Sequence, residues 1–284
     1  MIDYYLLTKP KIVIGNLVTV AAGFLLASRG NINLLLFLAT IVGIAFIMAS
    51  SCVFNNYINR ESDRKMNRTK KRALVIGLIP VRHALILATV LGIIGNIILF
   101  YFTNLLTVAV ADIGFFVYVV LYSIWKGHTI YGTAIGSIAG ATPPVVGYCA
   151  VSNNFDLGAL IFFGIMVFWQ MPHFFSIAIQ HLDDYARAQI PVLPVEKGML
   201  RTKIHITLYI LGFIATSLLL TFFGYTGTTY LIAAVAAGLI WLALSLKGFS
   251  ESNDRLWGRN MFLASLLAIN TLCLLIFLDV SGVV

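Results

Sequence analysis

The chain has 284 residues, of which 60% are hydrophobic and 11% are charged, and its formal net charge is +8. Soluble domains carry about a quarter charged residues, so this composition excludes a soluble globular protein and predicts an integral membrane protein. We interpret the positive charge as the charge that orients membrane proteins beside anionic lipid, and we expect no nucleic-acid partner.

Apolar stretches of about 20 residues, the length that crosses a bilayer as an α-helix, follow one another along the chain. They lie near 12–28, 34–54, 83–102, 105–125, 130–151, 157–180, 205–223, 229–247 and 260–279. The sequence therefore predicts an all-α integral membrane protein, a single domain over 1–284, with nine transmembrane helices bundled around a central cavity.

The basic residues distinguish the two ends of these helices. At one end lie the segments 1–11, 55–82, 126–129, 181–204 and 248–259. They hold all the lysines and arginines except Arg29 and Lys247, and Lys247 ends the eighth apolar run at this same end. The positive-inside rule makes this end cytoplasmic, together with the N-terminus, and we expect the cavity to open there. The first apolar run is longer than the core of a signal peptide, and no arginine- and serine-rich leader precedes it. We therefore expect a bacterial cytoplasmic membrane.

A polar stripe runs along the second span. Ser51, Asn55, Asn59 and Asp63 recur at intervals of four, which places them on one helix face, whereas Glu61 points away from that face. Amide and carboxylate oxygens are the ligands that Mg²⁺ prefers, usually shared with substrate phosphates. The spacing alone leaves open a solvated helix end with capping residues.

Four arginines continue at the same interval, namely Arg60, Arg64, Arg68 and Arg72. Like charges at this spacing repel one another on a helix. A diphosphate would relieve the repulsion, and it matches the fork of the guanidinium group. Topogenic charge explains the number of arginines equally well, but it does not explain the neighbouring asparagines and aspartate.

The fourth and fifth spans contain three further features. Lys126 is the only lysine or arginine in the connection between them, where it either reaches a diphosphate oxygen or marks the membrane edge, and it follows Tyr122. Asp112 is an intramembrane carboxylate for which the sequence offers no partner. In the fifth span, three glycines on one face predict close helix packing, and two prolines predict an interruption or kink. These residues are Gly132, Gly136, Gly140, Pro143 and Pro144.

The sixth span carries Gln170, His173, Gln180 and Asp184 on one face, over a length of about 21 Å. A histidine two to three turns inside a membrane helix normally faces a site or pathway, although a satisfied core histidine is the alternative. Asp183 and Asp184 end this helix as Asn59 and Asp63 end the second. We predict that the two acidic helix ends share one Mg²⁺–diphosphate site.

One segment resembles the first aspartate-rich motif of the intramembrane prenyltransferases related to UbiA. It is Asn55-Asn-Tyr-Ile-Asn-Arg-Glu-Ser-Asp-Arg-Lys-Met-Asn-Arg-Thr-Lys-Lys-Arg72. Further strings are similar to the haem O synthase branch of that family. They are Tyr131-Gly-Thr-x-x-Gly-Ser-x-x-Gly-Ala-x-Pro-Pro144, Trp169-Gln-Met-Pro-His173 and Ile190-Pro-Val-Leu-Pro194. The resemblance spans nearly the whole chain, from Lys9-Pro10-Lys11 to the last helix.

This resemblance implies a UbiA-like domain that transfers farnesyl from farnesyl diphosphate to a vinyl group of haem b. Water is added as well, and the products are haem O and diphosphate. The resemblance implies Mg²⁺ as cofactor, and haem A synthase or a terminal oxidase as candidate partners in the bilayer. It assigns catalysis to Asn55, Asp63, Arg64, Arg68, Lys126 and Asp184. The expected metal ligands are Asn55, Asp63, Asp183 and Asp184. The expected substrate-binding residues are Asn59, Arg60, Arg72, Tyr122, Gln170 and His173.

The chain departs from the family pattern at three positions. Asn59 stands where the family has aspartate, which removes a charge and shifts the metal-binding load to Glu61 or Asp63. Gly127 follows Lys126 where the family has arginine, and Ala188 replaces the partner aspartate of the second motif. Two other functions fit parts of the sequence. One is prenyl transfer to an aromatic acid of quinone synthesis, and the other is transport of an anionic lipid or haem.

Overall fold

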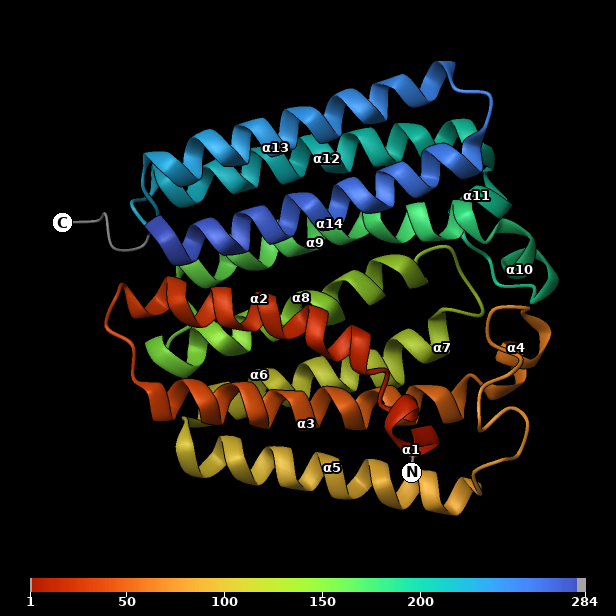
Figure 1. The fold of residues 1–284 in the computed structure, drawn as a ribbon, viewed down its shortest axis with the longest axis horizontal. Helices are drawn as coiled ribbons and strands as arrows, with labels where there is room; N and C mark the ends of the chain where they lie inside the picture. Colours follow the sequence, from red (N-terminus) through yellow and green to blue (C-terminus); the bar gives the residue numbers. More distant parts are fainter. Residues whose placement is uncertain (1, 280–284) are drawn as a thin grey trace.

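The structure, a computed structural model, describes residues 2–279 as an all-helical bundle (Figure 1). Within this range, nine helices are long and apolar enough to cross a membrane, which confirms the predicted number. They are α2 (Pro10–Ser28), α3 (Leu34–Ile58), α5 (Val81–Phe102), α6 (Leu105–Phe116) with its extension η1 (Val117–Tyr122) and α7 (Ser123–Trp125), α8 (Gly132–Ser152), α9 (Leu157–Gln180), α12 (Gly198–Phe222), α13 (Thr228–Lys247) with η2 (Gly248–Ser250), and α14 (Asp254–Asp279).

Four short helices complete the chain: α1 (Ile2–Leu7), α4 (Arg60–Lys65), α10 (Leu182–Arg187) and α11 (Leu193–Glu196). In Figure 1, α4, α7, α10 and α11 lie at the same end of the bundle, on the right. We call this the basic end. The connection that holds Arg29 lies at the opposite end, so the charge asymmetry of the sequence is an asymmetry between the two ends of the molecule.

Several helices extend further at the basic end than their apolar runs predict. Helix α3 continues to Ile58, α12 begins at Gly198 and α14 begins at Asp254, so each is longer by four to seven residues than the predicted span. Apolar stretches mark only the part of a helix that lies in hydrocarbon. The polar ends of these helices are therefore available to build a site.

Side-chain caps set the helix starts at the opposite end. Asn33 accepts a hydrogen bond from the Leu36 N–H and so caps α3. Asn104 accepts one from Thr107 at the start of α6, and Asp156 accepts two at the start of α9. Each cap satisfies N–H groups that the first helical turn leaves without a partner. This end of the bundle is closed by short capped turns.

Helix α8 is the central element, and α2 crosses it at very close range. A Cβ added to Gly23 of α2 would lie 2.0 Å from the Pro144 carbonyl oxygen, and one added to Gly147 would lie 2.1 Å from the Val20 carbonyl oxygen. The glycines that were predicted to allow close packing instead face other groups: a Cβ added to Gly136 would lie 3.0 Å from the Tyr122 ring, and one added to Gly140 would lie 2.2 Å from the Gln170 amide. The predicted interruption is wrong, because α8 continues through Pro143 and Pro144 as one helix.

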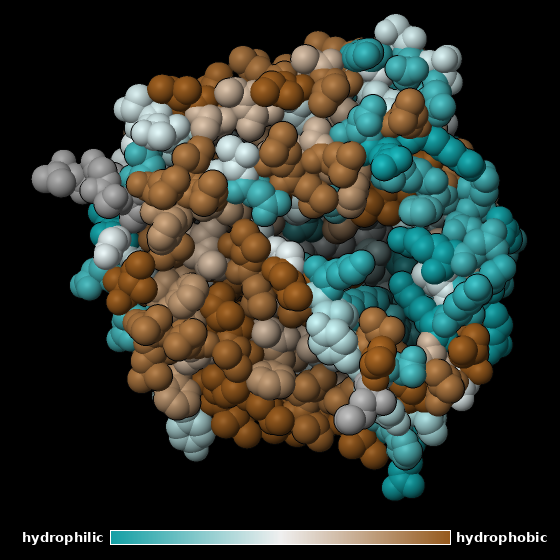
Figure 2. Space-filling view, viewed as in Figure 1, coloured by the Kyte–Doolittle hydropathy of each residue, from teal (hydrophilic) through white to brown (hydrophobic). Residues whose placement is uncertain are grey.

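Figure 2 shows apolar side chains over most of one face of the bundle and hydrophilic side chains gathered at the basic end. Beside the hydrophilic group, the surface is hollowed between α14 and α2. Asp112 does not line the interior. It is exposed on α6, and within residues 2–279 it has no ion-pair or hydrogen-bond partner.

Candidate active site

The polar stripe of the second span is a buried line of side chains. Ser51, Asn55, Asn59 and Asp63 are each less than 8% exposed. The Asn59 N–H donates to the Asn55 carbonyl at 3.0 Å, and the Asp63 N–H donates to the Asn59 carbonyl at 2.8 Å, so the helical period carries over from α3 into α4. The prediction of one shared face is therefore confirmed, and the Glu61 side chain points away, 64% exposed.

Asp63 lies in a buried ion pair at the end of this line. Its carboxylate is 2.5 Å from the Arg72 guanidinium, which also donates to Asn56 at 3.3 Å. The Thr69 hydroxyl donates to the Asp63 carbonyl oxygen at 2.9 Å. Because the aspartate side chain is only 4% exposed, it needs such a partner to remain charged.

Lys9 reaches the same line from the start of α2. Its Nζ donates to Asn55 Oδ1 at 2.8 Å. A lysine can only donate, so this contact identifies the oxygen of the Asn55 amide. Asn55 Nδ2 is then a buried donor without an acceptor in the described part of the chain. Burial lowers the pKa of Lys9 to about 8. Lys9 is not among the predicted site residues, and the string Lys9-Pro10-Lys11 is the one sequence signal that points to it.

Asp184 holds the segment that follows α4. Its carboxylate accepts hydrogen bonds from the N–H groups of Asn67 at 3.0 Å and Arg68 at 3.2 Å. Burial acts to raise the pKa of Asp184, but these two hydrogen bonds and Arg187 outweigh it and lower the pKa. Asp63 and Asp184 therefore lie against the same short segment, 66–69, at the basic end.

Apolar packing explains why this segment lies there. Met66 is 1% exposed and packs in a small core whose other members belong to α9 and the chain after α10. These members are Ala178, Ala188, Ile190 and Val192. Ile190 and Val192 belong to the string that resembles the haem O synthases. Burial of these side chains therefore brings the backbone N–H groups of 67 and 68 over Asp184.

The four arginines do not form one helical row. Helix α4 ends at Lys65 because Met66 is extended, so Arg68 and Arg72 lie in the turns beyond it. Arg60 and Arg64 pair with the exposed Glu61, at 3.6 Å and 3.2 Å, while Arg72 turns inward. The helical spacing was therefore the wrong guide beyond residue 65.

Asp183 lies apart from the buried group. Its exposed carboxylate forms an ion pair with Arg255 at the start of α14. Asp183 and Asp184 thus face different neighbours although they are adjacent in sequence. Of the two, the structure brings Asp184 to the segment beside Asp63.

Lys126 stands close to this group from the turn after α7. Burial lowers its pKa, while Tyr185 and Asp63 act to raise it, and Arg72 and Arg68 act to lower it further. Its Nζ lies 5.8 Å from the centre of the Tyr122 ring. Tyr185 lies near the same group and is not among the residues predicted from the sequence. Burial raises the pKa of Tyr185, although the positive charges of Arg68 and Lys126 act to lower it.

A second polar group lies deeper, on α9. His173 Nδ1 is 2.8 Å from Ser265 Oγ, and the imidazole stacks on Trp169. Gln170 is buried, and its Oε1 has no hydrogen-bond partner in the described residues. A Cβ added to Gly140 would lie 2.2 Å from this oxygen, so the glycine of α8 makes room for the Gln170 amide.

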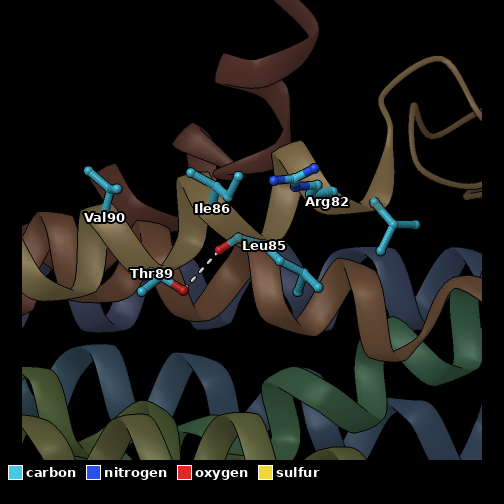
Figure 3. Close-up of a pocket in the computed structure, with 6 residues that line it drawn as sticks. Arg82, Leu85, Ile86, Thr89 and Val90 are labelled. Carbon is cyan, nitrogen blue, oxygen red and sulfur yellow. Dashed lines mark hydrogen bonds between the residues drawn. The ribbon is translucent and has the colours of Figure 1, made fainter.

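The group has oxygen donors of the kind that Mg²⁺ prefers, from an amide and two carboxylates. Asn55, Asp63 and Asp184 supply them, but no three histidine, cysteine, aspartate or glutamate side chains of residues 2–279 already stand in a metal-binding cluster. A separate depression lies on the outer face of α5, where Thr89 donates to the Leu85 carbonyl (Figure 3). Its lining residues belong to α5 alone and take no part in the polar group.

Comparison with known proteins gives the family. The UbiA prenyltransferase family matches residues 16–267. A protoheme IX farnesyltransferase of Protochlamydia amoebophila is 60% identical over 98% of this chain and 99% of its own length. One from Edwardsiella ictaluri is 52% identical, over 98% and 95%.

Solved structures show the same fold. The structure of a digeranylgeranylglyceryl phosphate synthase has a TM-score of 0.82 at 18% identity, covering 99% of this chain and 98% of that one. A UbiA homologue from Archaeoglobus fulgidus, bound to GPP and Mg²⁺, has a TM-score of 0.67 at 17% identity, over 97% and 99%. The match over most of the sequence, the close relatives and the shared fold together mean that this chain belongs to the UbiA prenyltransferase family.

Proposed function

We propose that this protein transfers the farnesyl group of farnesyl diphosphate to a vinyl group of haem b and so makes haem O. The observation that carries the proposal is the near full-length identity, 60% and 52%, to two protoheme IX farnesyltransferases. The buried polar group at the basic end adds a physical reason, because it gathers cations and hydrogen-bond donors that suit a diphosphate.

The side chains around Asn55 are the proposed diphosphate site. Asn55 Nδ2 is a buried donor that lacks an acceptor among the described residues, and a diphosphate oxygen would supply one. Lys9, Arg72 and Lys126 bring positive charge to the same place. Arg68 and the more exposed Arg60 and Arg64 add charge at the rim, where it attracts the anionic substrate.

Mg²⁺ suits this donor set, with Asp63 and Asp184 as proposed ligands, Asn55 through the second lone pair of the oxygen that Lys9 contacts, and Asp183 as a more distant carboxylate. When bound, the ion supplies neutralisation of the leaving diphosphate. The relative from Archaeoglobus fulgidus was solved with Mg²⁺ and an isoprenoid diphosphate, which supports this assignment. Asn59 contributes no charge, and its amide donates to the Asn55 carbonyl at 2.8 Å, so its proposed role is to hold the helix end.

The reaction begins with ionisation of farnesyl diphosphate and ends with neutralisation of the resulting cation. The C–O bond of farnesyl diphosphate breaks, the electron pair leaves with diphosphate, and an allylic cation remains. Lys9, Arg72 and Lys126 stabilise the charge that develops on the leaving group. The haem vinyl carbon attacks the cation. Water then adds to the new cation beside the porphyrin and loses a proton, which leaves the hydroxyl group of haem O.

The deeper group on α9 is the proposed haem end of the site. Gln170, His173 and Tyr122 are the proposed substrate contacts on the apolar side of the diphosphate. Apolar surroundings there delay capture of the farnesyl cation by water. We further propose that the hollow in Figure 2 is the mouth of a central cavity, and that the basic end faces the cytoplasm of a bacterial cell.

One assay tests the function. Purified protein in lipid is supplied with haem b, farnesyl diphosphate and Mg²⁺, and the mass of the porphyrin product is measured by mass spectrometry. We expect the mass of a hydroxyethylfarnesyl haem, no product with EDTA, and recovery when Mg²⁺ is restored. A prenylated product with an aromatic acid but none with haem b would replace this function by the quinone-pathway reaction. Uptake of haem into vesicles without formation of a prenylated porphyrin would indicate a transporter.

A further inference from the structure

The His173 imidazole is fixed by contacts with three neighbouring side chains. The Trp169 ring lies 4.9 Å from it, centre to centre, at 25°, and the Phe262 ring lies 4.8 Å from it at 31°. Its Nδ1 is 2.8 Å from Ser265 Oγ on α14. Ser265 also accepts a hydrogen bond from Trp169 Nε1 at its carbonyl oxygen, at 2.7 Å. One residue of α14 therefore positions two aromatic side chains of α9.

The hydroxyl group of Ser265 decides which nitrogen of His173 carries hydrogen. A hydroxyl has a single hydrogen, and Ser265 donates it to the Phe262 carbonyl one turn earlier, at 2.6 Å. Toward His173, Oγ is then an acceptor, so Nδ1 must be the donor. The neutral imidazole consequently carries its lone pair on Nε2.

Nε2 is also the nitrogen that remains available. Within residues 2–279, no group is hydrogen-bonded to Nε2, and it is not among the polar atoms that are both buried and unpartnered. The His173 side chain as a whole is half-buried. An accessible lone pair in apolar surroundings can accept a hydrogen bond or bind a metal, but it cannot donate to a carboxylate.

We propose that Ser265 is a positioning residue that locks His173 in the tautomer whose Nε2 binds the iron of the haem substrate. This inference rests on the proposed function, which makes haem b a substrate. It selects iron over propionate, because a propionate would require a donor at Nε2. The arrangement is also typical of metal-binding histidines, in which the ring nitrogen that does not bind the metal donates a hydrogen bond to a fixed acceptor.

The position of His173 suits this role. It lies seven residues before the end of α9, hence about 10 Å inside the basic end of that helix. Iron bound there would hold the porphyrin on the apolar side of Asp184 and the diphosphate site. Iron held at this depth would leave a vinyl group at the porphyrin edge within reach of the farnesyl carbon, and other contacts would have to select which edge faces it.

The test uses purified full-length protein with haem b as the only ligand, read by optical absorption and by resonance Raman spectroscopy of the iron–histidine stretch. Wild-type protein is expected to show histidine-bound iron, and His173→Ala is expected to lose that signal. Ser265→Ala should weaken haem binding by about 10-fold or more and shift the stretch, as loss of a hydrogen-bond partner does for metal-binding histidines. Ser265→Thr keeps the hydroxyl and should restore both.

Ser137→Ala is the matched control, because Ser137 is also buried and also donates to the carbonyl three residues earlier. It should bind haem as wild-type protein does, and thermal unfolding checks that each variant is folded. An iron–histidine signal unchanged in His173→Ala, or haem affinity unchanged in Ser265→Ala, would overturn the proposal. These results leave the function standing if the wild-type protein still makes haem O. Histidine-bound iron in a wild-type protein that makes no haem O would instead refute the function alone.

Discussion

Asn55 illustrates how much of this site depends on single atoms. Its oxygen is identified by Lys9, which lies just before α2, and its nitrogen is left as a buried donor. An unpaired buried donor costs about 1–3 kcal/mol, which binding of an acceptor recovers. A buried donor without an acceptor therefore contributes to the binding free energy of a ligand that supplies the acceptor.

Replacement of Asp63 by asparagine keeps the shape of the side chain but removes its charge. We expect kcat for haem O formation to fall by about 100- to 1000-fold, the size seen when one stabilising group is removed from a polar active site. The measurement is product formation at saturating farnesyl diphosphate. Glu61→Gln is the control, since that carboxylate is exposed and faces the other side of α4, and it should change kcat less than about twofold. An Asp63→Asn enzyme as fast as wild type would remove this residue from the mechanism.

Lys126 provides a pH test. Burial lowers its pKa, so its positive charge is lost at a lower pH than for an ordinary lysine. If the charge binds diphosphate, kcat/KM must fall as pH rises through that pKa. Arginine remains protonated throughout this range, so Lys126→Arg should move the alkaline fall to higher pH. Lys9 also loses its charge at alkaline pH, so the comparison is made in a Lys9→Arg background. Coincident pH profiles with and without Lys126→Arg in that background would contradict the assignment.

Spacing of four was enough to predict that Ser51, Asn55, Asn59 and Asp63 share one face, but not that this face is buried. It was not enough for Lys9, which is 46 residues from Asn55. Nor could it connect His173 with Ser265, 92 residues away. Such pairs arise from the packing of whole helices, and no local pattern records them.

At the scale of helices, apolar length predicted which segments would span the bilayer but not where each helix would end. Helix α12 begins seven residues before the apolar run because polar residues continue the same backbone hydrogen bonds outside hydrocarbon. The turn after Lys65 was missed for a different reason. Its shape is set by Asp184 and by the packing of Met66, both of which involve distant parts of the chain.

The crossing of α2 and α8 can be tested through one glycine. Gly23→Ala would place a Cβ 2.0 Å from a backbone oxygen, which cannot move aside as a side chain could. We expect a loss of about 1–3 kcal/mol, visible as a lower thermal unfolding midpoint in detergent. Gly15→Ala on the same helix has nothing within 4 Å and should leave the midpoint unchanged or raise it. Equal midpoints for both variants would mean that the helices are less closely packed than described.

For the whole molecule, the distribution of basic residues predicts the orientation in the membrane. The native cysteines are buried, so a new surface cysteine can be labelled selectively. A membrane-impermeant maleimide added to intact cells should label Asn154→Cys, at the end opposite the basic end, but not Lys197→Cys. Inverted vesicles should show the reverse pattern. Labelling of Lys197→Cys from outside the cell would reverse the orientation that the positive-inside rule gives.

The buried line that begins inside α3 and ends at the segment 66–69 has a consequence for the two products. One product is an anion with no affinity for hydrocarbon. The other has gained a fifteen-carbon chain, which makes it partition into lipid. Release toward the loops would deliver the anion to the aqueous compartment, while release between the helices would deliver the prenylated porphyrin to the lipids. Each turnover would thus place one product in water and the other in lipid. The reverse reaction would then be slow, because its two reactants would be in different phases.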